Sequence, residues 1–256
     1  MLSEILKEKK RFIENAKNRI PLKELLRQIE TITGPRSFLK ALGNGREMRL
    51  IAEVKRASPT AGMIRESFDP VVIAQIYQSA GADAVSVLTD EPFFMGSLDH
   101  LRNVKLNVRV PVLRKDFILD PYQIYEARAA GADAVLLIAD LLSQEDLEEF
   151  LGLARSLKME ALVEIHTVED LDKSLKIGAA IIGINQRNLH TFKTHREIVG
   201  QIIPMIPKEK VIVCESGIRN REDILYLKTL GVHAVLIGEI FMRSNDIAAK
   251  VKELFE

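Results

Sequence analysis

Four segments of the sequence share one pattern, in which an amphipathic stretch ends at a glycine and a short apolar run follows. They read SAGADAVSVL, AAGADAVLLI, KIGAAIIGIN and TLGVHAVLIG, with glycines at Gly81, Gly131, Gly178 and Gly231. This order is typical of a helix that stops at a glycine and leads into a buried strand. The glycines lie 50, 47 and 53 residues apart, whereas one strand and one helix take only about 25–30 residues. We therefore expect a second strand between each pair.

Apolar runs are present where those strands are expected: RLIAEVK, VPVLRKDF, MEALVEI and EKVIVCES. Amphipathic segments, clearest in PVVIAQIYQSA, DPYQIYEARAA, SQEDLEEFLGLARSLK and REDILYLKTL, predict helices between the strands. The predicted strands are 50–55, 84–88, 111–115, 134–138, 160–164, 181–185, 210–215 and 234–238. Strand and helix alternate without a hairpin signal, which indicates a parallel sheet covered on both faces. Eight such units in 256 residues favour one α/β domain, a (β/α)8 or TIM barrel.

Residues 1–48 precede the first unit and predict two or three amphipathic helices, with breaks at Pro21 and at the GPR turn that begins at Gly34. We expect them to form a helical extension that caps the barrel within a single domain, residues 1–256. A role in closing over a ligand is the alternative.

Composition excludes several classes of partner. Lys plus Arg and Asp plus Glu both number 36, so no net basic charge attracts nucleic acid or an anionic membrane. No stretch approaches the roughly 18 apolar residues of a membrane span, and the first residues lack the apolar run of a signal peptide. The single Cys214 can form no intramolecular disulfide, and its apolar strand predicts a core position rather than a nucleophile. We expect a cytoplasmic protein that acts on a small molecule, with a monomer as the default state.

Charged side chains stand at the ends of the odd-numbered predicted strands. Active sites of (β/α)8 barrels lie at the C-terminal strand ends, where side chains of alternate strands share a layer. Buried ion pairs are weak stabilisers, because desolvation offsets much of their attraction. A catalytic cluster is therefore favoured over a structural ion network. Its members are Glu53 and Lys55 on the first strand, Lys115, Glu164 and Glu215 on the third, fifth and seventh, and Asn185 and Arg187 at the end of the sixth.

Small residues follow the last two strands. Ser216 and Gly217 come after the seventh, and the eighth runs into Gly238 and Glu239. Loops at these two places frequently bind phosphate through backbone N–H groups, so we expect a phosphorylated substrate. The five histidines form no helical pair and have no cysteine partner, and no glycine-rich nucleotide motif occurs, so we expect neither a metal nor a cofactor.

Five separated segments resemble the signature segments of the indole-3-glycerol phosphate synthase family. They read IAEVKRASPTAG, VLRKDF, LVEIH, IGINQRNL and VCESGI, and GPRSFLKAL and LTDEPFFMGS extend the resemblance along the chain. The resemblance implies a lyase of tryptophan biosynthesis that acts on 1-(2-carboxyphenylamino)-1-deoxyribulose 5-phosphate. Ring closure, decarboxylation and dehydration would give indole-3-glycerol phosphate without a cofactor.

The resemblance also implies roles for single residues. Lys115 matches the general acid that acts on the substrate carbonyl oxygen, and Glu164 matches the general base. Glu53 and Lys55 match an acid/base and substrate-orienting pair, with Lys55 near the phosphate. The other matches are Asn185, Arg187, Glu215 and Ser58 for the carboxylate and the intermediate, Ser216, Gly217 and Gly238 for the phosphate, and Phe94, Phe117 and Leu189 for the aromatic ring.

Three positions depart from the family pattern. Thr60 replaces a usual serine, Cys214 a usual alanine, and Glu239 a common serine or threonine. At Glu239 only the backbone N–H is then expected to reach the phosphate.

Other interpretations of the same residues stay open. Another sugar-phosphate barrel, such as phosphoribosylanthranilate isomerase or an aldolase that forms a Schiff base on Lys55 or Lys115, would use the same strand ends. A phosphate-ligand sensor would bind without turnover. The division of acid and base roles between Glu53 and Glu164 is also open.

Overall fold

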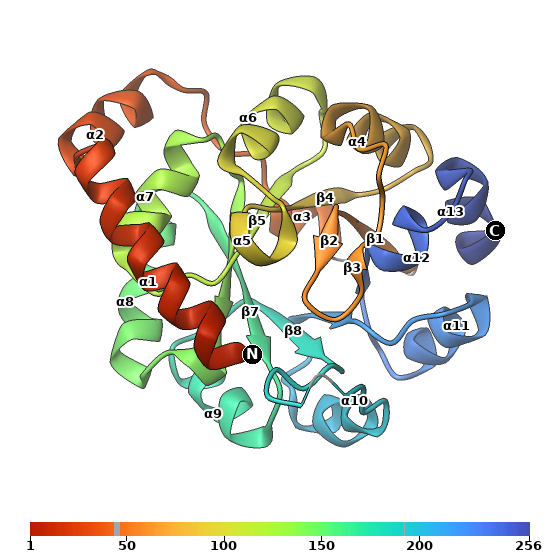
Figure 1. Ribbon diagram of the computed structural model, residues 1–256. Coiled ribbons are helices and arrows are strands. Elements are labelled where there is room, and N and C mark those ends of the chain that lie inside the picture. The colour runs from red at the N-terminus through yellow and green to blue at the C-terminus, as the bar shows by residue number, and fades with distance from the viewer. Residues whose placement is uncertain (44–46, 192) are drawn as a thin grey trace.

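The computed structural model describes residues 1–43, 47–191 and 193–256. Eight parallel strands close into a barrel in the order β1-β10-β9-β8-β7-β6-β5-β4, and helices surround it (Figure 1). The strands are β1 (Arg49–Val54), β4 (Ala84–Leu88), β5 (Val112–Lys115), β6 (Ala134–Ile138), β7 (Glu160–Ile165), β8 (Ile181–Asn185), β9 (Val211–Glu215) and β10 (Ala234–Ile237). The predicted (β/α)8 barrel is confirmed, and each strand lies where the sequence predicts it.

Helices that follow the strands form the outer ring (Figure 1). They are α4 (Pro70–Ser79), α6 (Leu98–Asn107), α7 (Pro121–Ala129), α8 (Gln144–Ser156), α9 (Val168–Lys176), α10 (Glu197–Ile202), α11 (Arg221–Thr229) and α13 (Ile247–Phe255). The four glycines of the repeated pattern all have positive φ, from 70° to 97°. Glycine adopts this conformation without the strain that a Cβ adds, so it ends a helix and turns the chain into the next strand.

The barrel core is built by alternation along each strand. Alternate side chains face the same side, so the row of β1 that contains the buried Ile51 continues to Glu53. On β5 the corresponding row contains Leu113 and ends at Lys115. The apolar members belong to one cluster inside the barrel. The interior is therefore apolar towards the start of the strands and charged at their C-terminal ends, called the mouth below.

The N-terminal segment contains α1 (Leu2–Arg19), α2 (Leu22–Thr31) and α3 (Phe38–Leu42). The first residues of α1 lie near the ends of β7 and β8 (Figure 1), and Leu2 and Ile5 line the cavity of the mouth. The short α3 lies at the opposite end of the barrel, where Ser37 Oγ donates to Glu160 Oε1 at the start of β7 over 2.9 Å. The segment thus contacts both ends of the barrel.

Three short additions surround the mouth. A hairpin, β2 (Ala57–Ser58) and β3 (Gly62–Met63), follows β1, and the helices α5 (Glu91–Phe94) and α12 (Glu239–Met242) follow β4 and β10. The 3-10 turns η1 (Ala139–Leu141) and η2 (Ile203–Met205) complete the elements. Within the described ranges, no helix has the length and apolar character needed to cross a membrane.

Candidate active site

A cavity of about 450 Å³ opens at the mouth. Every residue that the sequence singles out for the site lines it, although these residues come from seven different segments of the chain. They are Glu53, Lys55, Ser58, Phe94, Lys115, Phe117, Glu164, Asn185, Arg187, Leu189, Glu215, Ser216, Gly217, Gly238 and Glu239. The closed topology is the reason, because it brings all eight strand ends to one rim.

Two lysines and three carboxylates form the polar centre of this cavity. Lys115 Nζ lies 3.2 Å from Glu164 Oε2 and 3.4 Å from Glu215 Oε2. Lys55 Nζ lies 2.5 Å from Glu53 Oε1. All three glutamates are buried, at 5% exposure or less. Lys55 stands one residue beyond the end of β1, so it reaches back to Glu53 from the rim.

The charges of the centre follow from burial and proximity. Burial disfavours the charged form of Lys115, but the electrostatic attraction of Glu164, Glu215 and Glu53 outweighs this effect. The pKa of Lys115 is therefore raised, and the side chain is an ammonium. Burial also disfavours ionised Glu164, yet Lys115 and then His166 lower its pKa below the usual value. Burial raises the pKa of Glu215 to about 8, against the attraction of Lys115. Two carboxyl groups that share one lysine are thus held in opposite protonation states near neutral pH.

Neighbours on β7 and β8 orient Glu164. Asn185 Nδ2 donates to Glu164 Oε1 over 3.1 Å, and Asn185 Oδ1 accepts from the backbone N–H of Arg187 over 3.0 Å. His166 Nε2 lies 3.4 Å from Glu164 Oε1. His166 was not predicted as a site residue, although it stands two residues after Glu164, just beyond the end of β7, where strand alternation would place it on the same side.

Two glycines make room for the carboxylates. A Cβ added at Gly183 on β8 would lie 2.5 Å from Glu215 Oε1. One added at Gly238 would lie 2.8 Å from the Glu53 Cβ atom. Gly238, which the sequence assigns to phosphate binding, therefore also leaves the space that Glu53 occupies. The role of Gly183 could be found only from the three-dimensional arrangement.

The loop after β9 has an unusual backbone. Ser216 and Gly217 are both left-handed, with φ of 64° and 71°. The Ser216 carbonyl accepts from Gln186 Nε2 over 2.8 Å, and the Gly217 carbonyl accepts from the Arg196 guanidinium. Side chains from the β8 loop thus hold both carbonyls of this turn.

Glu239 begins α12 on the neighbouring part of the rim. Its side chain pairs with Arg243 Nη2 at 2.9 Å, and Arg187 Nη2 lies 3.9 Å from it. Arg187 Nη1 also donates to Thr60 Oγ1 of the hairpin loop over 3.3 Å. Thr60, which departs from the usual serine, thus keeps its hydroxyl in the site.

An apolar wall borders the charged centre. The rings of Phe94 and Phe117 lie 6.2 Å apart, and Leu189 packs against the same inner cluster. Leu2 and Ile5 of α1 add to this wall. The sequence analysis missed these two residues, because the amphipathic pattern of α1 indicates a buried face but not the surface that it covers.

Cys214 is fully buried on β9, and burial raises the pKa of its thiol. It lies in the core, as predicted. In the described part of the chain, no three His, Cys, Asp or Glu side chains are grouped to hold a metal ion.

Comparison with known proteins relates the chain to one family. A model of the family described as "Indole-3-glycerol phosphate synthase" matches residues 2–254. A protein of Dehalococcoides mccartyi strain CBDB1 with that name is 50% identical over 245 residues, which are 94% of this chain and 95% of the relative. One of Alkaliphilus metalliredigens is 42% identical over 254 residues, 99% of this chain and 97% of the relative.

Two solved structures show the same fold at low sequence identity. The 3-hexulose-6-phosphate synthase of Salmonella typhimurium superposes with a TM-score of 0.65 at 13% identity, over 81% of this chain and 96% of the other. The N-acetylmannosamine-6-phosphate 2-epimerase of Clostridium perfringens gives 0.64 at 12% identity, over 88% of this chain and 99% of the other. The family match over residues 2–254 and the identities of 42% and 50% show that the chain belongs to the indole-3-glycerol phosphate synthase family.

Proposed function

We propose that Lys115 is the general acid and Glu164 the general base of the indole-3-glycerol phosphate synthase reaction in this chain. The family is a carboxy-lyase family of tryptophan biosynthesis. The observation that carries the proposal is the buried contact of 3.2 Å between the Lys115 ammonium and the Glu164 carboxylate. The contact supports the proposal, because an ammonium can donate a proton and a carboxylate can accept one within the same cavity.

The first step requires an acid. When the ring carbon that bears the carboxylate attacks the substrate carbonyl carbon, negative charge grows on the carbonyl oxygen. Lys115 donates a proton to that oxygen, which becomes the hydroxyl of the intermediate. A positioned general acid contributes about 10²- to 10⁴-fold to the rate. The anilino nitrogen becomes an iminium in the same step.

The iminium allows carbon dioxide to leave. The electron pair of the broken C–C bond returns to the ring, restores its aromaticity and neutralises the iminium nitrogen. The dehydration that follows removes a proton from the carbon next to that nitrogen, and Glu164 accepts it. The hydroxyl leaves as water with a proton from an acid. Glu215 is the donor that we propose, because burial keeps it protonated near neutral pH.

The remaining lining residues fit the parts of the substrate. Ser216, Gly217, Gly238 and the backbone N–H of Glu239 would hold the phosphate, with Lys55 beside it. Arg187 and Ser58 would hold the carboxylate. The apolar wall would hold the aromatic ring, because Phe94, Phe117 and Leu189 offer it a surface without polar groups.

We also propose that the chain works as a cytoplasmic monomer on this small molecule alone, without nucleic acid. The zero net charge supports this proposal. The contacts of α1 and α3 with opposite ends of the barrel support a single domain for residues 1–256.

The reaction is tested by following indole formation. The chain has no Trp, so product fluorescence appears against a background of tyrosines. Addition of the carboxyphenylamino-deoxyribulose phosphate should give a catalytic rise in indole fluorescence. Binding of the substrate without such a rise would support a sensor, and a lysine adduct trapped by borohydride would support an aldolase.

The base is tested by comparing Glu164→Gln with Glu53→Gln. Glu164→Gln should lose turnover by about 10²-fold or more while the protein stays folded. A Glu164→Gln rate near that of the wild type, with loss in Glu53→Gln, would give the base role to Glu53.

A further inference from the structure

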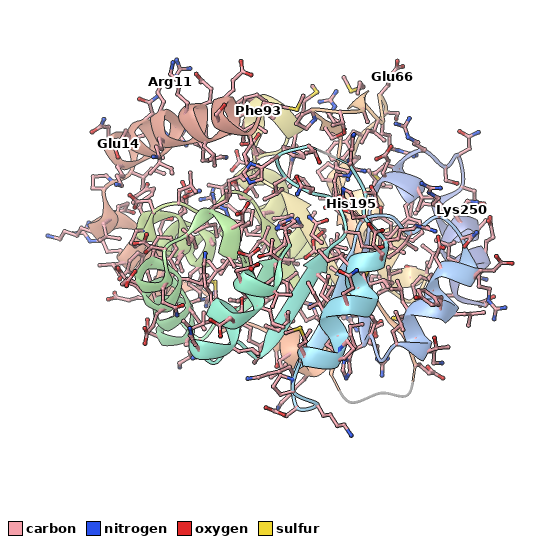
Figure 2. All side chains as sticks on the ribbon, turned by 90° about the horizontal axis from the view of Figure 1, so that it is seen from below. Arg11, Glu14, Glu66, Phe93, His195 and Lys250 are labelled. Carbon is pink, nitrogen blue, oxygen red and sulfur yellow. The ribbon has the colours of Figure 1, made fainter. Side chains whose placement is uncertain are left out.

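The helix α1 packs on the barrel through a buried stripe that contains one charged residue. The stripe consists of Leu2, Ile5, Lys9, Ile13 and Ala16, at the three- to four-residue spacing of one helix face. Arg11 and Glu14 point away from the barrel on the outer side (Figure 2). Lys9 is only 2% exposed. It is therefore a buried charge that the proposed reaction does not use.

Lys9 bridges the ends of two neighbouring barrel strands. Its Nζ lies 2.6 Å from Asp90 Oδ2 and 2.7 Å from Asp116 Oδ1, and both carboxylates are at most 2% exposed. Asp90 follows β4 and Asp116 follows β5, and these two strands pair with each other. Both aspartates also line the cavity of the mouth.

Asp116 forms hydrogen bonds in the turn that directly follows the proposed acid, which is the last residue of β5. It follows Lys115 directly, and its Oδ1, which contacts Lys9, also accepts from the backbone N–H of Phe117 over 2.8 Å. Its Oδ2 accepts from Thr89 Oγ1 over 2.6 Å and from Arg114 Nη2 over 3.1 Å. A shift of Asp116 would therefore move the residues on both of its sides.

Asp90 has the same position in the neighbouring loop. Its Oδ1 accepts from the backbone N–H of Phe93 over 3.0 Å and so begins α5, the helix that ends at Phe94. Lys9 thus contacts the two segments that lead to Phe94 and Phe117, and the second of these directly follows Lys115.

Stability alone is a poor reason for a lysine at this position. Desolvation of an ion pair offsets much of its attraction, and apolar side chains of similar size often serve as well or better. The other members of the α1 stripe are apolar. Unlike an apolar side chain, a lysine can hold two particular carboxylates, those of Asp90 and Asp116, at a fixed distance.

We propose that Lys9 is a positioning residue for the reaction, which holds Asp116 and, through it, the Lys115 side chain in the reactive place. The inference rests on the proposed role of Lys115. It makes the N-terminal helix a functional part of the site as well as a cover.

The test compares three variants of the full chain. Lys9→Met removes the charge and keeps the length of the side chain. Lys10→Met is the matched control, because Lys10 is exposed on the same helix. Ile13→Ala is the structural control, since Ile13 is buried in the same stripe but does not line the cavity. Substrate turnover and thermal stability are measured for each.

Lys9→Met should lower kcat by about 10- to 100-fold with KM changed by less than about threefold, because a small misplacement of a catalytic group is enough for such a loss. Lys10→Met should match the wild type. Ile13→Ala should lower the melting temperature, and kcat measured well below that temperature should be close to the wild-type value.

The pH profile supplies a second readout. Burial disfavours ionised Asp116, but Lys9 and then Arg114 hold its pKa below the usual value. The charged groups around it are Lys9 from α1, Asp90 after β4 and Arg114 from β5, with Glu126 of α7 paired to Arg114. Without Lys9, Asp116 takes up a proton at a higher pH. The acidic limb of the Lys9→Met profile should therefore move to higher pH, and that of Ile13→Ala should not.

Wild-type kcat and pH profile in Lys9→Met would overturn the proposal. The proposal would also be overturned if Ile13→Ala had the same melting temperature as Lys9→Met and showed the same changes in kcat and in the pH profile. These outcomes differ from failure of the proposed role of Lys115, because that failure would be seen as retained turnover in a variant of Lys115 itself.

Discussion

At the scale of single residues, the central feature is that Glu164 and Glu215 share the Lys115 ammonium and yet hold different charges. Glu164 also receives a hydrogen bond from Asn185, which stabilises its carboxylate. Glu215 Oε1 has no hydrogen-bond partner among the described residues, so nothing but Lys115 compensates its burial. The difference in partners explains why the pKa of Glu164 is lowered while that of Glu215 is raised, which fits the roles proposed for them as proton acceptor and proton donor.

Replacement of Glu215 tests its protonation state through stability. The folded protein keeps the proton on Glu215 up to about pH 8, whereas the unfolded chain releases it near the ordinary value of 4.5. The wild type therefore loses stability through this group as the pH rises across that window. Glu215→Gln should show a smaller fall in the denaturation midpoint between pH 5 and pH 8.

The control is Glu209→Gln, which changes an exposed glutamate just before β9. It should keep the wild-type dependence on pH. An equally steep fall in Glu215→Gln and in the wild type would show that Glu215 is ionised throughout.

Gly238 gives a second residue-scale prediction. An alanine here would place its Cβ 2.8 Å from the Glu53 Cβ and 3.0 Å from the Cδ. Glu53 would have to shift from its present place beside Lys55, so Gly238→Ala should lower kcat by about tenfold or more. Gly152→Ala is the matched control, because Gly152 of α8 has no atom within 4 Å of the added Cβ. Equal rates in the two variants, measured with purified folded protein, would contradict the packing argument.

At the scale of elements, the conformation of the loop after β9 depends on a glycine at one position. Gly217 has a φ of 71°, and an added Cβ would lie 2.9 Å from Thr194 Cγ2 and 3.2 Å from Gln186 Nε2. Alanine would therefore strain the backbone and displace the neighbours that hold the turn. Since this loop is the proposed phosphate site, Gly217→Ala should raise KM by about tenfold and weaken inhibition by inorganic phosphate.

Gly178→Ala separates backbone strain from binding. Gly178 has nearly the same φ, 70°, but it follows α9 at the other end of the strands, and no atom lies within 4 Å of the added Cβ. This control should lose about 1–2 kcal/mol of stability and keep the wild-type KM. If KM rose equally in both variants, the loop after β9 would have no particular role in binding phosphate.

At the scale of the whole molecule, the sequence predicts the barrel because its signals are local. A glycine such as Gly131 ends a helix whatever lies elsewhere in the fold, and the apolar run after it predicts a strand. Once eight strands close, alternation places Lys115, Glu164 and Glu215 at one mouth. The sequence alone therefore predicts that these residues meet in one site.

The features that the sequence analysis missed depend on contacts between distant segments. Lys9 meets Asp90 and Asp116 only because α1 folds back over the mouth. The room that Gly183 gives to Glu215 likewise appears only when β8 and β9 are paired. Charge states belong to the same class, because the raised pKa of Glu215 follows from burial and from three-dimensional distances to other charges.

The role of Lys115 as the general acid is tested most directly by the steady-state rate of indole formation in Lys115→Ala, with substrate binding measured separately. We expect kcat to fall by about 10²-fold or more, because the proposed general acid is lost. Substrate affinity should stay within about tenfold of the wild type, since the proposed phosphate and ring contacts remain. A kcat near the wild-type value would contradict the assignment of Lys115 as the acid.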